Sequence, residues 1–394
     1  MRAVTWQGFH DVRVEEVPDP AIEEPTDAVL RITSSGLCGS DLHLYEVLGA
    51  FMAEGDVLGH EPMGVVEAVG ADVTGLSVGD RVVVPFQIAC GHCFMCDRGL
   101  QTQCETTQVR DQGMGAALFG YTELYGQVPG AQAEYLRVPH ADYGPIKVPD
   151  GPADDRFLFL SDVLPTAWQA VAYAEVGPGD TLAVLGQGPI GSMAARIARH
   201  QGVETVIVID PETDRLGRAA EWGAAPLPWE DHDQVVSSVR EMTDGRGPDA
   251  VIDAVGMEAH GSSVAEAAQK ATALLPDAVA KKLMTTGGVD RLAAVSAAIA
   301  MVRRGGTISL SGVYGGAADP LPLMTMFDKQ VTVRMGQANV RRWSDAILPL
   351  LEGDDDPLGV DDFATHHLTL DEAPEAYARF QDKEPGVHKV VFRP

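Results

Sequence analysis

The 394-residue chain has few cysteines, and neither an export signal nor a membrane span is evident. Its first residues, MRAVTWQGFHDVRVEEV, contain no apolar core of signal-peptide length, and no stretch approaches the length of a transmembrane helix. We therefore expect a cytoplasmic protein with no membrane partner. In that reducing compartment the five cysteines should be thiolates or metal ligands rather than disulfides.

Positive charge is also scarce. Lys and Arg number 29 against 57 Asp and Glu, so the formal net charge is −28. Such a surface repels phosphate groups, which disfavours nucleic acids and anionic membranes as partners. The apolar content of 45% with only 22% charged residues is that of a folded globular protein, and the length suits two domains.

The pattern of the chain changes near residue 162. Before it, short Val- and Ile-rich runs such as VLRITSSG and GDRVVV are broken by Gly and Pro, as in a β-rich domain. After it, strands alternate with Ala-rich helices, which predicts βαβ units and a parallel sheet. The fold class is therefore α/β, with a β-rich domain over 1–162 and 337–394 and a parallel-sheet domain over 163–336. The connection between VIDAVG and the next strand is longer than an ordinary crossover between parallel strands, so residues 257–290 should be an insertion, which we expect to be helical.

Four of the five cysteines lie close together in CGHCFMCDRGLQTQC. Four thiolates complete a tetrahedral zinc shell and leave no position for substrate, so this site should be structural. Its ligands would be Cys90, Cys93, Cys96 and Cys104. Four buried cysteines packing as small apolar groups are the alternative, and the polar neighbours argue against it. A zinc ribbon that reads nucleic acid is disfavoured by the acidic charge.

A second metal site is indicated by the fifth cysteine, Cys38 in GLCGSDLH, and by His60 in GHEPMGVV. A catalytic zinc needs three protein ligands and an open position. Each residue alone could be structural, since a lone Cys usually packs and a lone His is more often a core residue. The neighbouring GSDLH, which adds a hydroxyl and an imidazole, favours the metal hypothesis.

The stretch TLAVLGQGPIG predicts a strand, a glycine-rich turn and a helix, the arrangement that binds a dinucleotide pyrophosphate. The turn contains Gly186, Gly188, Pro189, Ile190 and Gly191, and the helix amino terminus supplies amide donors.

An acidic residue, Asp210, follows at the end of the next strand-like run, VETVIVID. A carboxylate there accepts hydrogen bonds from ribose hydroxyls and repels a 2′-phosphate, so NAD is expected rather than NADP. Arg215 is the complication, because an Arg near this position can hold a 2′-phosphate. Asp210 as a helix cap and Arg215 as a surface charge are the alternatives.

The chain resembles zinc-containing alcohol dehydrogenases of the medium-chain dehydrogenase/reductase family in the order of its motifs. These motifs are GLCGSDLH, GHEPMGVVEAVG, GDRVVV, the four-cysteine loop, the glycine-rich turn and APEAYARF. The resemblance implies a GroES-like catalytic domain and a Rossmann coenzyme domain. It implies two zinc ions per chain, one catalytic and one structural. Cys38 and His60 match catalytic zinc ligands, and the third ligand position is occupied by Asp162.

The resemblance also implies roles for residues around the catalytic metal and the nicotinamide. Glu61 matches the acid behind the metal, Ser40 the hydroxyl that contacts the substrate oxygen, and His43 the far end of a proton relay. Thr166 matches a position near the nicotinamide. Val313 matches the backbone that cradles the nicotinamide amide.

Asp162, GAALFGYTELYG and GVYGG resemble the glutathione-independent formaldehyde dehydrogenase subgroup. The expected reaction is hydride transfer between NAD and a small alcohol or aldehyde. A polyol or sugar dehydrogenase and a non-catalytic dinucleotide-binding relative are the alternatives. The resemblance implies a homodimer or homotetramer formed partly through the coenzyme domain. It also suggests that the insertion at 257–290 is associated with tightly held NAD and aldehyde dismutation.

Overall fold

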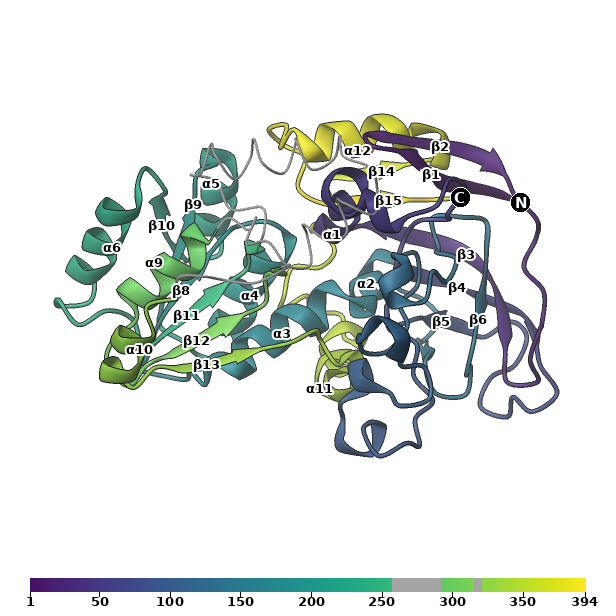
Figure 1. The fold of residues 1–394 in the computed structure, drawn as a ribbon, viewed down its shortest axis with the longest axis horizontal. Helices are drawn as coiled ribbons and strands as arrows, with labels where there is room; N and C mark the ends of the chain where they lie inside the picture. Colours follow the sequence, from purple (N-terminus) through teal and green to yellow (C-terminus); the bar gives the residue numbers. More distant parts are fainter. Residues whose placement is uncertain (257–291, 315–320) are drawn as a thin grey trace. The chain divides into compact units, whose positions relative to one another are not determined.

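The structure is a computed structural model, which describes residues 1–256, 292–314 and 321–394 (Figure 1). The insertion predicted at 257–290 therefore lies outside the described residues. No described helix combines the length and the apolar character needed to cross a membrane.

The chain divides into two compact units. The first consists of Met1–Pro165 and Ala338–Pro394, and the second of Thr166–Gln337. The sequence predicted boundaries after residues 162 and 336, close to these divisions.

The first unit is built on β-sheets, because its apolar residues alternate along short runs that end at glycine or proline. Its long central strand β3 (Ala28–Leu37) pairs antiparallel with β4 (Glu61–Val69). The seven-stranded sheet has the order β14-β15-β3-β4-β5-β7, and β6 also pairs with β3. The remaining strands are β1 (Arg2–Gly8), β2 (Asp11–Glu16), β5 (Arg81–Val83), β6 (Tyr135–Val138), β7 (Ile146–Lys147), β14 (His366–Leu368) and β15 (Val390–Phe392).

The α-helices described in the first unit are few, beside several short 3-10 helices and a π-helix at His43–Val47, and one face of each longer α-helix is buried. In α12 (Ala373–Gln381), Pro374 lies in the first turn, and Tyr377 and Phe380 are buried. The others are α1 (Gly39–Leu42), α2 (Asp155–Leu158) and α11 (Val340–Glu352). The β-rich first domain expected from the sequence is confirmed.

The second unit is a six-stranded parallel sheet with the order β10-β9-β8-β11-β12-β13. Its inner strands are almost wholly apolar, as expected for strands covered on both faces. This is the doubly wound order, and it confirms the Rossmann fold. The strands are β8 (Thr181–Leu185), β9 (Thr205–Asp210), β10 (Ala225–Pro228), β11 (Ala250–Asp253), β12 (Thr307–Leu310) and β13 (Thr332–Met335).

The described helices of the second unit connect these strands. They are α4 (Pro189–His200), α5 (Thr213–Glu221), α6 (His232–Glu241), α9 (Ala293–Met301) and α10 (Leu323–Lys329), while α3 (Val163–Ala174) crosses the unit boundary. The strand order reverses between β8 and β11, which are neighbours in the sheet. In doubly wound folds the ligand binds at the carboxyl ends of the strands beside this point.

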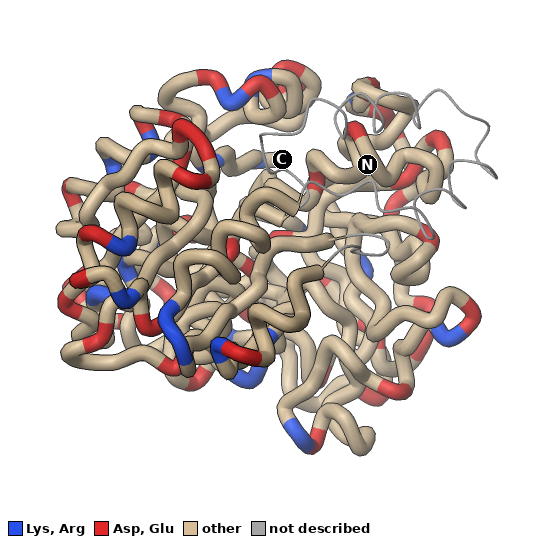
Figure 2. Tube along the Cα trace, turned by 60° about the vertical axis from the view of Figure 1, so that its left-hand side comes forward, with Lys and Arg blue, Asp and Glu red and all other residues tan. Residues whose placement is uncertain are grey.

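Acidic residues are spread over loops and helices of the described part of the chain, and basic residues are fewer (Figure 2). This distribution agrees with the net charge of −28.

Candidate metal and coenzyme sites

Three predicted metal ligands lie at the ends of neighbouring elements of the first unit. Cys38 directly follows β3, and His60 directly precedes β4. Because Gly36 pairs with Glu61 in the register of these strands, the two ligands lie at the same edge of the sheet. Asp162 follows a short 3-10 turn, and the carbonyl before it accepts a hydrogen bond from the amide of Phe86.

The ligand atoms of these three residues are separated by distances that suit one metal ion. Oδ2 of Asp162 lies 3.5 Å from Sγ of Cys38 and 3.5 Å from Nε2 of His60. Zinc at its usual bond lengths holds such atoms about 3.4–3.6 Å apart. With Glu61 included, the ligand atoms all lie within 4.8 Å of one another, and the residues are buried. The donor set therefore fits a zinc ion with mixed sulfur, nitrogen and oxygen ligands.

The electrostatics of this cluster also favour a cation. Burial and the nearby Asp162 raise the pKa of Cys38 to about 11. Burial alone would lower the pKa of His60, but Asp41, Asp162 and Cys38 together raise it well above its usual value. The protein has thus gathered acidic groups in a buried place where a positive charge, as a proton or as a metal ion, is stabilised.

Asp41 supports His60 from behind. Its Oδ1 lies 3.1 Å from Nδ1 of His60, so the ring directs Nε2 toward Cys38 and Asp162. Its Oδ2 accepts hydrogen bonds from the amide of Cys38 at 2.9 Å and from Gln132 at 3.3 Å. A carboxylate behind a histidine is the usual support of a metal ligand. Sequence reasoning missed Asp41, although it lies within GSDLH.

Glu61 is held by a second residue that sequence reasoning missed, Lys389. Nζ of Lys389 lies 2.7 Å from Oε1 and 2.6 Å from Oε2 of Glu61, and it donates a hydrogen bond to the carbonyl of Leu37 at 2.9 Å. Both side chains are fully buried. A Cβ at Gly36 would lie 1.9 Å from Oε2 of Glu61, so the site requires glycine there. The only sequence signal was a lysine in the apolar run HKVVF.

The predicted relay residues lie in one short helical segment. The hydroxyl of Ser40, in α1, is 3.2 Å from Sγ of Cys38 and 3.1 Å from Nε2 of His60. His43 follows three residues later, on the same face of the helical segment, and is buried. The structure therefore brings Ser40 against the predicted metal ligands.

Two aromatic side chains flank this cluster. The rings of Phe86 and Tyr121 meet His60 edge-on, each at a centroid distance of 6.4 Å. Burial raises the pKa of Tyr121 well above its usual range, so the group is a neutral hydroxyl. Neither residue was identified from the sequence as part of the site.

The four-cysteine loop forms a second, separate cluster in the same unit. The four sulfur atoms lie within 4.8 Å of one another, and those of Cys93 and Cys104 are 3.9 Å apart. Tetrahedral zinc separates its sulfurs by about 3.8 Å. Sγ of Cys90 accepts a hydrogen bond from Thr106, and Sγ of Cys93 accepts one from the amide of Glu105. These contacts fit thiolates that surround a metal.

The surrounding chain favours the thiolate of Cys104, whereas burial raises the pKa of its neighbour Cys96. Burial alone would raise the pKa of Cys104, but hydrogen bonds from Thr107 and from the amide of Cys90 lower it to about 6. The surrounding chain therefore stabilises the thiolate of Cys104, which is the form that binds a metal.

The glycines of the second unit form the expected tight turn between β8 and α4. Gly186 has a φ of +87°, and a Cβ at Gly191 would lie 1.8 Å from the carbonyl oxygen of Gly186. At Gly188, the residue before α4, a Cβ would meet only Arg215 at 3.9 Å. Pro189 and Ile190 open the helix. The turn is closed on its inner side and open at Gly188, which fits a pyrophosphate at the helix amino terminus.

Asp210 ends β9, and its side chain is buried beside this turn. Its Oδ2 accepts a hydrogen bond from the amide of Gln187 at 2.6 Å, and Oδ1 accepts one from the amide of Glu212 at 2.8 Å. Each carboxylate oxygen retains a lone pair that could accept a ribose hydroxyl. The guanidinium of Arg215 is 4.0 Å from Oδ2. Both predicted residues therefore lie at the carboxyl edge of the sheet.

The remaining predicted coenzyme residues also lie in described segments. Thr166 lies in α3 and is the first residue of the second unit. Val313 follows β12 and is 45% exposed.

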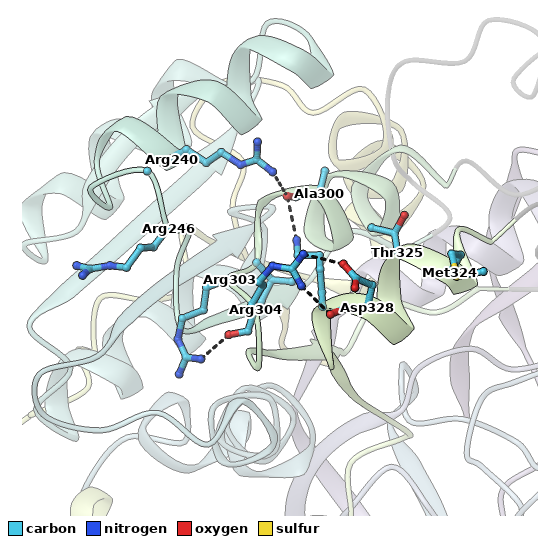
Figure 3. Close-up of a pocket in the computed structure, with 11 residues that line it drawn as sticks. Arg240, Arg246, Ala300, Arg303, Arg304, Met324, Thr325 and Asp328 are labelled. Carbon is cyan, nitrogen blue, oxygen red and sulfur yellow. Dashed lines mark hydrogen bonds and ion pairs between the residues drawn. The ribbon is translucent and has the colours of Figure 1, made fainter.

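A cavity of about 1000 Å³ elsewhere in the second unit is lined by five cations (Figure 3). Each has a partner in the chain. Arg303, Arg304 and Arg246 pair with Asp249, Asp328 and Asp244, while Arg240 and Lys329 donate hydrogen bonds to carbonyls at the end of α9. The chain itself compensates these charges, and we assign the cavity no ligand.

Known proteins resemble the chain over its whole length. The family model for the alcohol dehydrogenase GroES-like domain matches residues 24–150, and that for zinc-binding dehydrogenases matches 189–275. An uncharacterized zinc-type alcohol dehydrogenase-like protein, AdhB, of Bacillus subtilis is 40% identical over 100% of both chains. The glutathione-independent formaldehyde dehydrogenase of Pseudomonas aeruginosa is 33% identical over 98% of this chain and 96% of its own. Alcohol dehydrogenase TADH from Thermus sp. ATN1 has a TM-score of 0.81 and 36% identity, covering 100% of this chain and 99% of that one.

Proposed function

The chain belongs to the zinc-containing alcohol dehydrogenases of the medium-chain dehydrogenase/reductase family, and on this premise we propose that it transfers a hydride between NAD and a small alcohol or aldehyde. The observation that carries the proposal is the buried cluster of Cys38, His60 and Asp162 with Ser40 against it. We propose two zinc ions per chain, one in this cluster and one in the four-cysteine loop. The formaldehyde dehydrogenase relative favours a short substrate.

Each residue of the cluster has a role in this proposal. When bound, zinc supplies Lewis acidity toward the substrate oxygen, and NAD supplies the hydride acceptor. Cys38, His60 and Asp162 would hold the ion, and a site with three protein ligands would leave a position open to the substrate. Ser40 accepts the proton that the substrate releases, and His43 passes it toward solvent.

Asp162 distinguishes this ligand set from one with two cysteines. A carboxylate is a harder donor than a thiolate and transfers less charge to the metal. With Asp162 as a ligand, the site would leave more positive charge to polarise the substrate oxygen, and the buried salt bridge between Glu61 and Lys389 adds no net charge beside it.

Metal analysis combined with a substrate panel tests the proposal. Protein purified without added metal should contain two zinc atoms per chain and should reduce NAD with short alcohols or aldehydes, followed by nicotinamide absorbance. A preference for polyols or sugars would favour the alternative dehydrogenase. One zinc atom or none, with NAD binding but no turnover, would favour a non-catalytic dinucleotide-binding relative.

Asp210 underlies the proposed preference for NAD over NADP. Its buried carboxylate would lie beside the 2′ position and repel a phosphate there, although Arg215 lies 4.0 Å away. The values of kcat/KM for the two coenzymes measure the preference. A tenfold preference for NADP would contradict it.

We further propose a homodimer or homotetramer that associates partly through the second unit. Among the described residues, β13 pairs only with β12, and all four of its residues are exposed. Its neighbour α10 carries Met324 and Phe327 with exposed fractions of 80% and 83%. Large exposed apolar groups beside a free sheet edge favour association with a second copy. Light scattering after size-exclusion chromatography should give at least twice the 41.9 kDa chain mass.

Tightly held NAD with aldehyde dismutation remains a prediction from the resemblance alone, since residues 257–290 lie outside the described part of the chain. Protein purified without added coenzyme should then carry NAD, and an absorbance spectrum of the denatured supernatant would reveal it.

A further inference from the structure

Asp253 ends strand β11 with a fully buried carboxylate that serves several donors. Its Oδ1 accepts hydrogen bonds from the amides of Val255 at 2.9 Å and Gly256 at 3.4 Å. Its Oδ2 accepts one from the hydroxyl of Tyr314 at 2.5 Å. Its backbone carbonyl accepts two more, each 2.9 Å long, from the amides of residues 311 and 312. One residue therefore ties the loop after β11 to the loop after β12.

The same two loops pack so closely that only glycine fits between them. A Cβ at Gly256 would lie 2.6 Å from the amide nitrogen of Val313, and a Cβ at Gly312 would lie 2.2 Å from that of Gly256. The pyrophosphate turn joins this contact, because a Cβ at Gly186 would lie 2.8 Å from the side chain of Val255. The loops after β8, β11 and β12 are thus one packed body at the carboxyl edge of the sheet.

Burying a carboxylate is costly, and burial raises the pKa of Asp253, although Tyr314 and the amides of Val255 and Gly256 counter part of this rise. The rest of β11 is Ala-Val-Ile, so an apolar residue would pack at its end without that cost. A buried polar group is useful where its hydrogen bonds select one loop conformation. Here the hydrogen bonds of Asp253 fix the conformation of the backbone from 311 to 314.

We propose that Asp253 and Tyr314 form a positioning pair that holds the backbone around Val313 ready to receive the nicotinamide carboxamide of NAD. The inference rests on the proposed coenzyme function. A carboxamide needs both a donor and an acceptor, and a backbone segment supplies an N–H and a C=O. A loop that is ordered before binding does not lose conformational entropy when the ring arrives, so affinity increases. Contact with the glycine-rich turn also holds this backbone in a fixed position relative to that turn.

Isothermal titration of NAD and of ADP-ribose tests this role without any turnover. ADP-ribose has the adenosine, pyrophosphate and ribose of NAD but lacks the nicotinamide. Tyr314→Phe should weaken NAD about tenfold, the size of one hydrogen bond to a charged group, and leave ADP-ribose within about twofold of wild type. Equal weakening of both ligands, or unchanged NAD affinity, would overturn the proposal.

Asp253→Asn provides a second, independent variant. It keeps an oxygen for the two amides but replaces the carboxylate acceptor of Tyr314 with a neutral N–H₂ group, which leaves at most a weaker hydrogen bond in the reverse direction, so an NAD-specific loss of the same sign is expected. The double variant Asp253→Asn/Tyr314→Phe should lose no more than the larger single loss, because both changes act on the same hydrogen bond. Additive losses would mean that the two residues do not act as a pair.

Asp249→Asn is the matched control at the opposite end of β11. Asp249 also ties the sheet, accepting hydrogen bonds from the amide of Thr181 at 2.8 Å and from Arg303 at 2.6 Å. This variant should not change the ratio of the two affinities. Failure of the pair is distinct from failure of the coenzyme function, because in the latter case wild-type protein would bind neither NAD nor ADP-ribose.

Discussion

The two cysteine-containing clusters of the first unit are alike in size and opposite in construction. In each, the ligand atoms lie within 4.8 Å of one another. The loop cluster takes four sulfurs from Cys90 to Cys104, one continuous segment. The other joins Cys38, His60 and Asp162, which are up to 124 residues apart, and offers three different donor elements.

Their surroundings differ in the same way. The loop sulfurs accept hydrogen bonds from residues that are close to them in the sequence, such as Thr106. The mixed cluster has a second layer of buried charges, with Asp41 behind His60 and Lys389 on Glu61. A metal site that only stabilises a loop needs no more than its ligands. A site proposed for catalysis also needs charged groups around the ligands that orient them and set the electrostatic potential at the metal. The predictions below test that difference.

The largest expected effect is on turnover, from Cys38→Ser. Loss of the thiolate should reduce kcat/KM at least ~10³-fold, because a metal ion contributes several kcal/mol of transition-state stabilisation. Zinc content should fall from two atoms to one, while the thermal unfolding midpoint stays near that of wild type. Near-normal turnover in this variant would remove the proposed zinc mechanism.

The same atom change in the loop, Cys104→Ser, should act on stability instead. Cys104 is fully buried, and removal of one of four thiolates should release the loop zinc. We expect the free energy of unfolding to fall by more than about 4 kcal/mol, a size typical of losing a structural metal. Urea unfolding measures it, with Cys38→Ser as the matched control. An equal loss in both variants would erase the distinction between the clusters.

The fold could be predicted well from the sequence because its signals are local. The glycine-rich turn, the alternation of strands and Ala-rich helices, and the short broken strands before Asp162 each depend on neighbouring residues. The four-cysteine loop is readable for the same reason. The carboxyl-edge position of Asp210 follows from strand direction alone.

The second layer of the mixed cluster could not be predicted, because it depends on pairings across the fold. Lys389 reaches Glu61 only because β15 pairs with β3 and β3 with β4. Asp253 and Tyr314 meet because β11 and β12 are adjacent. No spacing rule connects residues 328 positions apart, and Tyr121 beside His60 has no local signal.

Replacing Lys389 should destabilise the protein through the charge that remains. Lys389→Met leaves the buried carboxylate of Glu61 without its partner, which costs about 3–5 kcal/mol. Burial already raises the pKa of Glu61, so the orphaned group should bind a proton more readily in the folded state. The deficit should therefore be smallest below the unfolded-state pKa of Glu61 and should grow as pH rises from there through the raised folded-state pKa.

Urea unfolding of Lys389→Met between neutral and mildly acidic pH measures this effect. Lys389→Arg keeps the charge and serves as the control, with a smaller and less pH-dependent loss. A Lys389→Met protein as stable as wild type at neutral pH would show that the pair contributes nothing beyond packing.

The smallest effect tests the support of His60. Asp41→Asn keeps the shape of the side chain but replaces the charge 3.1 Å from Nδ1 of His60 with a neutral amide, so the ring becomes a weaker ligand. Zinc affinity and kcat/KM should each fall about 10–100-fold, as for other residues behind metal ligands. Competition with a chromophoric chelator measures the affinity of the mixed cluster. The exposed Asp97 of the four-cysteine loop gives the control, since Asp97→Asn removes an equal charge that contacts no ligand of the mixed cluster. If both variants behaved alike, Asp41 would act only through overall charge, and the mixed cluster would need no more support than the loop.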